Sequence, residues 1–196
     1  MGMRFCLGVV LRQRYRSWSV ENVSTPATRA LAASYAATHP GEIDHASVDA
    51  ADYGSPSSRV RLIIGPPAAI MQLRLAVGPV RSLSQAFLER GLVPVSKFVK
   101  NNSIKRDGSA CVRSTYHPCH TALASTPLRW CDVDGATVRC FSVSETAVAL
   151  GIPAGWKLPK GQRRGIRALG NAVPTHLSKA IMEASMRAVR HAGKAA

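Results

Sequence analysis

Short apolar runs and longer helical periods alternate along the first and last thirds of the chain. The run Trp18-Ser19-Val20 predicts a short strand ending at Glu21-Asn22-Val23, and Val60–Ile64 predicts a second strand that Gly65 closes. Helices are expected over 27–37 with Ser24 or Thr25 as N-cap, over 81–90, over 142–151 and from Thr175 onward. Strands that alternate with helices indicate an α/β fold.

The middle of the chain follows a different pattern. Residues 92–138 have no long helical period and are rich in Ser, Thr, Pro, Cys and His, as irregular or β-rich lobes are. The 196 residues suffice for one domain with a smaller lobe. We therefore expect an irregular or β-rich lobe inserted into an α/β domain.

The chain is strongly basic. It has 26 Lys and Arg against 11 Asp and Glu, a formal net charge of +15, which points to a polyanionic partner such as nucleic acid or an acidic membrane face. Its longest apolar runs, Phe5–Leu11 and Leu62–Met71, fall well short of the roughly 20 residues that cross a bilayer. No small-residue cleavage site follows Phe5–Leu11. We expect an intracellular protein without a membrane partner, in the cytoplasm or nucleoid of a bacterium or phage, or in a eukaryotic nucleus.

The cations gather in two runs. One lies between Arg90 and Arg113, and the other between Pro153 and Ala196, where only Glu183 opposes them. A single charged run is usually a solvated surface, but two runs of one sign indicate a surface that binds a polyanion. The candidate nucleic-acid contacts are Lys100, Arg106, Arg113, Arg163 and Arg164.

The cysteines predict neither disulfides nor a metal site. Their number, five, is odd, and no Cys-x-x-Cys occurs. The cluster His117-Pro118-Cys119-His120 has no second pair of ligands at zinc-finger spacing. We expect reduced cysteines in or near a core.

Three short motifs occur in a fixed order. Glu21-Asn22-Val23 comes first, then Arg59-Val60-Arg61 at the start of an apolar strand, then Gly170-Asn171-Ala172-Val173-Pro174 before the last helix. In a strand the two arginines project from one face, and such cations need anionic or carbonyl partners nearby.

This ordered set resembles the C-terminal two-thirds of the DNA (cytosine-5)-methyltransferase family. Glu21-Asn22-Val23 is similar to its Glu-Asn-Val motif, Tyr53–Gly65 to its Gly-x-Pro-Gln-x-Arg-x-Arg strand, Arg139–Pro153 to its Arg-Glu-x-Ala helix, and Gly170–Pro174 to its closing Gly-Asn-Ala-Val-Pro. The resemblance spans Trp18 to about Ala188 and implies a partial Rossmann-like methyltransferase sheet. It also implies a target-recognition lobe where the chain becomes irregular.

The resemblance implies methyl transfer from S-adenosylmethionine to a cytosine extruded from double-stranded DNA. It makes Glu21 the group that binds the N3/N4 edge and supports protonation at N3, and Arg61 the contact to O2. Arg59 corresponds to the arginine that helps hold the catalytic loop. Asn171, with Ala172 and Val173, corresponds to residues beside the methionine end of the cofactor.

Two parts of the family pattern have no counterpart here. The nucleophile lies in a Pro-Cys-Gln upstream of Glu-Asn-Val, whereas the one Pro-Cys of this chain is Pro118-Cys119, downstream and followed by His120. The glycine-rich cofactor loop is missing too, because no Gly-x-Gly occurs in the 196 residues. Ser57 also stands where the family has glutamine.

We therefore expect a truncated or split methyltransferase, completed by a separate chain that carries the N-terminal half. Its expected parts are a partial catalytic domain (1–66), a recognition lobe (67–138) and C-terminal motifs that return to the catalytic domain (139–196). The alternatives are a non-catalytic DNA-binding module and an RNA cytosine methyltransferase-like fragment.

Overall fold

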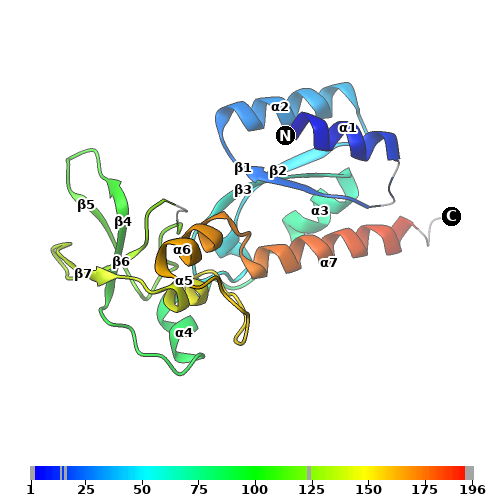
Figure 1. Cartoon of the computed structure of the whole chain (residues 1–196). Coiled ribbons are helices and arrows are strands. Elements are labelled where there is room, and N and C mark those ends of the chain that lie inside the picture. The colour runs from blue at the N-terminus through cyan, green and yellow to red at the C-terminus, as the bar shows by residue number, and fades with distance from the viewer. Residues whose placement is uncertain (1–2, 14, 16, 123–124, 193–196) are drawn as a thin grey trace. The chain divides into compact units, whose positions relative to one another are not determined.

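The computed structural model describes residues 3–13, 15, 17–122 and 125–192, which form two compact units (Figure 1). Unit 1 takes Met1–Asp49, Val60–Gly78 and Ser178–Ala196. Unit 2 takes Ala50–Arg59 and Pro79–Leu177. The functional division at residues 66 and 138 stays a prediction.

Unit 1 is built on a three-stranded antiparallel sheet. Its strands are β1 (Val20–Val23), β2 (Asp44–Asp49) and β3 (Val60–Gly65), in the order β1-β3-β2. Since β3 runs antiparallel to both neighbours, β1 and β2 are parallel to each other, and α2 (Pro26–Thr38) connects them. The α/β class is confirmed in this unit, although every direct strand pairing is antiparallel.

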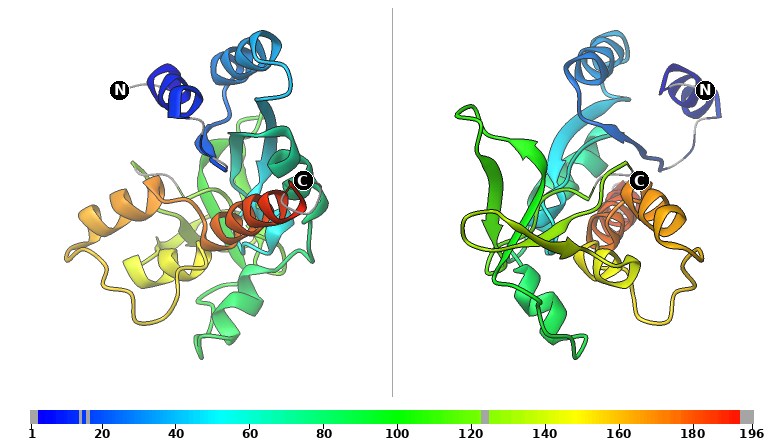
Figure 2. Two further views of the ribbon diagram at one scale, coloured as in Figure 1. Left: turned by 90° about the vertical axis from the view of Figure 1, so that its right-hand side faces the viewer. Right: turned by 60° about the vertical axis from the view of Figure 1, so that its left-hand side comes forward.

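Helices cover both faces of this sheet. On one face, α1 (Met3–Gln13) and α2 lie side by side and bury Leu7 and Ala32 against Leu62 and Ile64 of β3 (Figures 1 and 2). On the other face, Ile63 of β3 meets α3 (Pro67–Leu75) and the part of α7 that belongs to unit 1. Helix α7 (Thr175–Ala192) begins in unit 2 and continues in unit 1. None of the described helices is long and apolar enough to cross a membrane.

Local capping explains where several helices begin. Thr25 is the N-cap of α2, and its side chain exchanges hydrogen bonds with Thr28. Ser82 and Ser142 form similar capping boxes at α4 (Leu83–Leu88) and α5 (Val143–Ala149). The helix expected over 81–90 is therefore shorter at both ends. The first strand ends at Glu21-Asn22-Val23, as expected, but begins at Val20 instead of Trp18.

Unit 2 carries the lobe expected in the middle of the chain, and that lobe is β-rich. Its four-stranded antiparallel sheet has the order β5-β4-β6-β7 (Figure 2). The strands are β4 (Phe98–Ile104), β5 (Ala110–Ser114), β6 (Arg129–Cys131) and β7 (Thr137–Cys140). A short 3-10 turn (Ala50–Tyr53) and the helices α4, α5 and α6 (Gln162–Asn171) complete the unit.

An aromatic cluster forms the centre of unit 2. The rings of Trp130 and Phe141 stack with centroids 4.4 Å apart, and Phe87 meets the edge of Trp130 at 5.4 Å. All three side chains are buried. Such pairs add to the free energy that their apolar burial already contributes.

Glu145 ties this cluster to the strands. One carboxylate oxygen accepts hydrogen bonds from Trp130 Nε1 (3.1 Å) and from Arg139 (2.7 Å), and the other accepts from Arg139 (2.8 Å) and from the Ser142 backbone N–H (2.7 Å). Burial alone would raise the pKa of Glu145, but these hydrogen bonds outweigh it and lower the pKa to about 2.

Glu145→Gln should lower the free energy of unfolding of unit 2 by about 2 kcal/mol at pH 7, because the amide cannot replace the bidentate pairing with Arg139. The pKa of Glu145 falls from 4.5 to about 2 on folding, so its contribution is present above pH 4.5 and is lost as the pH falls toward 2. Urea unfolding at pH 7 and pH 3, followed by tryptophan fluorescence in the background Trp18→Phe and Trp156→Phe so that Trp130 reports alone, measures both effects.

Glu183→Gln is the matched control, because its pair with Lys179 is exposed and 3.7 Å long. It should change stability by less than about 1 kcal/mol. Equal unfolding midpoints for the two variants at pH 7 would contradict the assignment of Glu145 as the polar centre of unit 2.

Candidate functional site

The first two motifs meet in unit 1 as a carboxylate–guanidinium pair. Glu21 lies in β1 and Arg61 at the start of β3, and the register places Glu21 opposite Ile63 and Val23 opposite Arg61. Arg61 Nε lies 2.6 Å from Glu21 Oε1, and the Arg61 side chain is 9% exposed against 29% for Glu21. The guanidinium is thus covered while the carboxylate still reaches solvent.

Burial and the Glu21 carboxylate shift the pKa of Arg61 in opposite directions. Burial lowers the pKa of Arg61, and the charge and hydrogen bond of Glu21 raise it, with burial the larger effect. Arginine stays protonated at neutral pH under such shifts. Among the described residues, one Arg61 N–H pairs with Glu21 and another donates to the Val60 carbonyl (2.8 Å), so two of the donors of the guanidinium group are used. The pair can therefore offer a neighbouring acceptor and donor to one edge of a planar ring.

Arg59, two residues earlier, is buried in unit 2 and binds backbone carbonyls. It donates to Ala122 O at 2.8 Å and to Gly170 O at 2.5 Å. Val60 is exposed between the two buried arginines, which agrees with the expected alternation. The requirement that both cations have anionic or carbonyl partners is confirmed.

The residues before Arg59 run alongside Pro118–Ala122 within unit 2. The Cys119 N–H donates to Pro56 O, and the Ser58 N–H donates to Cys119 O, both at 2.9 Å. Thr121 adds a hydrogen bond to Ser58 O at 2.6 Å. Ser57, which replaces the glutamine of the family pattern, is fully buried in this arrangement.

Cys119 is enclosed by these contacts and is unsuited to act as a nucleophile. Its side chain is 0% exposed, and burial raises its pKa to about 12, although Arg113 and a backbone hydrogen bond oppose the shift. Only the thiolate attacks carbon efficiently. The other four cysteines are also free: Cys131 is buried, Cys111 is half-buried, and Cys6 and Cys140 are exposed, so the expectation of core cysteines is wrong for the last two.

Asn171 ends α6, and Ala172 and Val173 follow it. Asn171 is exposed, and none of the described residues makes a hydrogen bond with its side-chain amide. The two following side chains are half-buried. One free amide beside two apolar groups fits one edge of the methionine part of a cofactor, but it supplies no charged group for the amino-acid end.

The five residues expected to contact nucleic acid differ in their exposure and in whether they already donate hydrogen bonds within the protein. Arg106, Arg163 and Arg164 are exposed. Lys100 donates to Gly135 O, and Arg113 donates to Pro118 O at 3.0 Å, so both already bind carbonyls of unit 2. Lys157, Lys160 and Arg167 belong to the second basic run of the sequence and are exposed too, although they are not among the five candidate contacts.

No group of three metal-ligating side chains lies together in the part of the chain that the structure describes. His120 is buried beside Cys119, and burial, followed by the charge of Arg113, lowers its pKa. His120 Nε2 is buried without a hydrogen-bond partner among the described residues, so His120 and Cys119 do not form a hydrogen-bonded catalytic pair.

Comparison with known proteins identifies the fold. No family model and no curated protein matches the chain. A solved structure described as a DNA modification methyltransferase encoded within an E. coli prophage matches 92% of this chain and 72% of its own, at 14% identity and a TM-score of 0.60. The S. pombe Dnmt2 methyltransferase matches 89% of this chain and 67% of its own, at 11% identity and a TM-score of 0.53.

The chain has a methyltransferase fold. This confirms the architecture that the motifs implied. At 14% and 11% identity the likeness concerns the fold alone, so it assigns no substrate to the Glu21–Arg61 pair.

Cys119 should resist alkylation in the folded protein. Because burial raises its pKa to about 12 from 9.0, its thiolate fraction should be about a thousandfold below that of an unperturbed cysteine, before access is considered. Iodoacetamide at pH 8 followed by peptide mapping should label the exposed Cys6 and Cys140 first.

The same reagent in urea is the control, and it should label Cys119 as fast as Cys140. Native labelling of Cys119 at the rate of Cys140 would mean that Cys119 is accessible, contrary to its enclosed position.

Proposed function

We propose that this chain supplies the base-binding part of an S-adenosylmethionine-dependent DNA (cytosine-5) methyltransferase. The observation that carries the proposal is the 2.6 Å pair of Glu21 and Arg61. It joins the two positions that resemble the base-binding residues of that family. The methyltransferase fold supports the proposal, because it supplies the frame in which this pair is expected.

The chemistry of cytosine fits this pair. Carbon C6 of the ring is a poor electrophile until N3 gains a proton and O2 is polarised. A carboxyl group at Glu21 can share a proton with N3 and accept from the N4 amino group. The remaining N–H groups of Arg61 can donate to O2. Both contacts strengthen as negative charge develops on the ring, so they favour the transition state over the ground state.

The Pro-Cys of this chain does not supply the nucleophile that the family motif would. Cys119 is enclosed, and no Pro-Cys-Gln occurs in the 196 residues. We therefore propose that a polypeptide carrying Pro-Cys-Gln and the glycine-rich loop completes the site. Bound S-adenosylmethionine would supply the methyl group. Asn171 would line one edge of its site.

A second candidate is a DNA-binding protein without catalysis. The enclosed Cys119 and the exposed cations Arg106, Arg163 and Arg164 favour it. A pure binder, however, needs no carboxylate held on a buried guanidinium. The activity of the completed protein therefore separates the two candidates.

Glu21→Gln should lower kcat by roughly 10²–10⁴-fold in a complex of this chain with such a complementing polypeptide. Glutamine keeps the size of the side chain but cannot share a proton with N3, so the loss appears in kcat while DNA affinity changes little. Transfer of tritiated methyl groups to duplex DNA measures kcat, and the same assay on RNA tests the RNA alternative.

Glu42→Gln, at an exposed carboxylate of unit 1, is the matched control and should retain full activity. This chain assayed by itself should transfer no methyl groups. Full turnover by the Glu21→Gln complex would reduce Glu21 to a structural partner of Arg61, and transfer by this chain alone would overturn the requirement for a second polypeptide.

DNA binding by this chain should weaken steeply with salt. Each phosphate contact contributes a slope of about −0.9 to the dependence of log K on log salt concentration. Replacing both Arg163 and Arg164 with Glu should reduce that slope by about 1.8 and weaken binding to all sequences alike. Fluorescence anisotropy at salt concentrations from about 50 to about 300 mM measures the slope. Repeating it with two unrelated duplexes shows whether the affinity falls equally for both sequences.

Arg4→Glu combined with Arg12→Glu is the matched control, because it makes the same change in net charge on the exposed side of α1. Its effect on the slope should be smaller. Salt-independent binding would contradict the DNA-binding function as a whole.

A further inference from the structure

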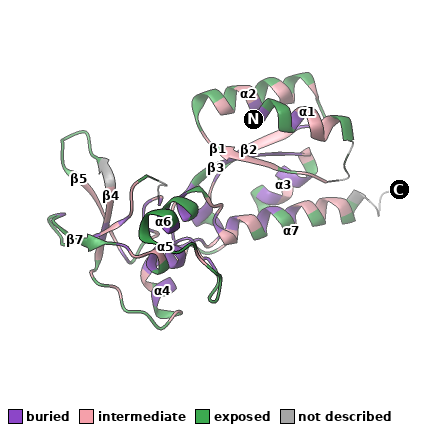
Figure 3. Ribbon diagram, in the orientation of Figure 1, coloured by how far each residue is buried: buried purple, intermediate pink, exposed green. Residues whose placement is uncertain are grey.

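The connection between α5 and α6 exposes a tryptophan. Trp156 is 64% exposed, whereas Trp130 is fully buried and Trp18 is half-buried. Residues 153–161 around it are exposed except for Leu158 (Figure 3). An exposed tryptophan leaves a large apolar ring in water, so it is typical of a binding surface.

Contacts within unit 2 hold both ends of this connection. Arg90 donates to Ile152 O before it, and Gln162 donates to Phe141 O at 2.6 Å after it. Between them, Leu158 packs against the buried core of unit 2. The loop is therefore anchored two residues from Trp156 by a partly buried side chain.

The helix that follows is held just as closely. A side chain at Gly165 would come within 2.6 Å of Val143, so α6 can approach α5 only because this position is glycine. Glycines also shape the loop, since Gly155 and Gly161 have φ values of +84° and +88°. The surface around Trp156 is therefore largely formed before any ligand binds.

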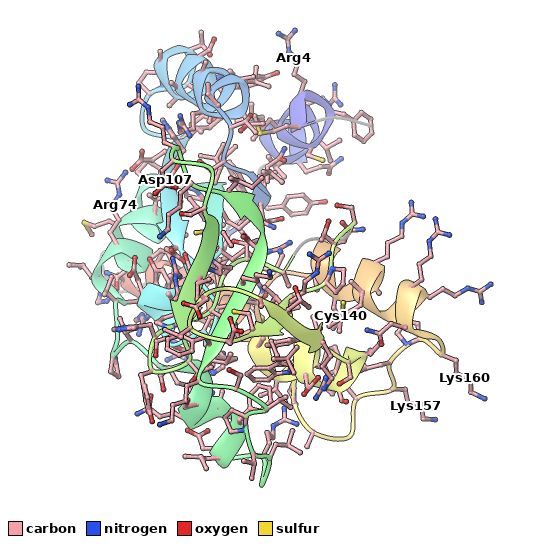
Figure 4. The ribbon with its side chains drawn as sticks, turned by 90° about the vertical axis from the view of Figure 1, so that its left-hand side faces the viewer. Arg4, Arg74, Asp107, Cys140, Lys157 and Lys160 are labelled. Carbon is pink, nitrogen blue, oxygen red and sulfur yellow. The ribbon has the colours of Figure 1, made fainter. Side chains whose placement is uncertain are left out.

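Cations surround Trp156 in the sequence, and no acid opposes them. No Asp or Glu occurs from Thr146 to Met182. Figure 4 shows Lys157 and Lys160 pointing into solvent beside α6, from which further nitrogen-tipped side chains project. The exposed cations of this stretch are Lys157, Lys160, Arg163, Arg164 and Arg167. Their charge favours a polyanion.

We propose that Trp156 stacks on an unpaired base of a single-stranded stretch of nucleic acid, while these five cations bind its phosphates. Every base offers a π-face, so this contact tolerates any sequence. A base inside a duplex already stacks on its neighbours, so the ligand needs unpaired bases. This inference rests on the proposed DNA-binding function. That function depends on the attraction between cations and phosphates, and the stacking of Trp156 on a base is an additional contact.

The test uses this chain and a fluorescein-labelled oligonucleotide of sixteen thymidines, about the length of one single-stranded binding site. Binding should quench tryptophan fluorescence. Trp156→Ala should abolish most of the quenching and weaken binding about 5- to 100-fold, whereas Trp156→Phe should retain most of the affinity. The salt slope of Trp156→Ala should equal that of the unaltered chain, because no cation is lost.

Phe5→Ala is the matched control, since Phe5 is a half-exposed aromatic residue beside Arg4 on α1 and should leave affinity unchanged. Wild-type affinity of Trp156→Ala, with binding and its salt slope intact, would overturn the stacking proposal alone. Absence of any nucleic-acid binding by the unaltered chain would overturn the DNA-binding function as well. A blue shift of Trp156 emission on anionic lipid vesicles, without quenching by the oligonucleotide, would overturn the proposal in favour of a lipid surface.

Discussion

Burial of two guanidinium groups, two residues apart, is the constraint on which both units depend. A buried cation is costly unless anions or carbonyls surround it. In unit 1, Arg61 meets this requirement with Glu21, which joins β1 to β3 through side chains as well as backbone. In unit 2, Arg59 meets it with the carbonyls of Ala122 and Gly170, which come from segments far apart in the sequence.

These partners also decide what remains available to a ligand. The carboxylate of Glu21 is held by Arg61 Nε, so its position is fixed before anything binds. Arg59 donates a hydrogen bond to the carbonyl of Gly170, the residue directly before Asn171. The side-chain amide of Asn171 makes no hydrogen bond with any of the described residues. Each arginine thus satisfies its charge within the fold and, in the function proposed above, holds a neighbouring polar group in place for a ligand.

The sequence predicted what depends on short-range patterns. Thr25 and Ser142 cap helices through residues three positions away, and the apolar run Val60–Ile64 makes a strand in the core. Helix α1 was not predicted. Strand β2 was not predicted either, because Asp44–Asp49 carries polar residues and becomes a strand only through its pairing with β3. The enclosure of Cys119 also arises from pairing with distant residues, so spacing along the chain could not reveal it.

A buried ion pair contributes little to stability by itself, because the cost of removing two charges from water offsets their attraction. Removing one partner alone is costly, because it leaves the other charge buried and unpaired, whereas replacing both partners of such a pair with apolar residues is often neutral. Glu21 remains 29% exposed, so its carboxylate is accessible to a ligand while Arg61 is covered. The pair is therefore better explained by a ligand that needs both an acceptor and a donor than by the stability of the sheet.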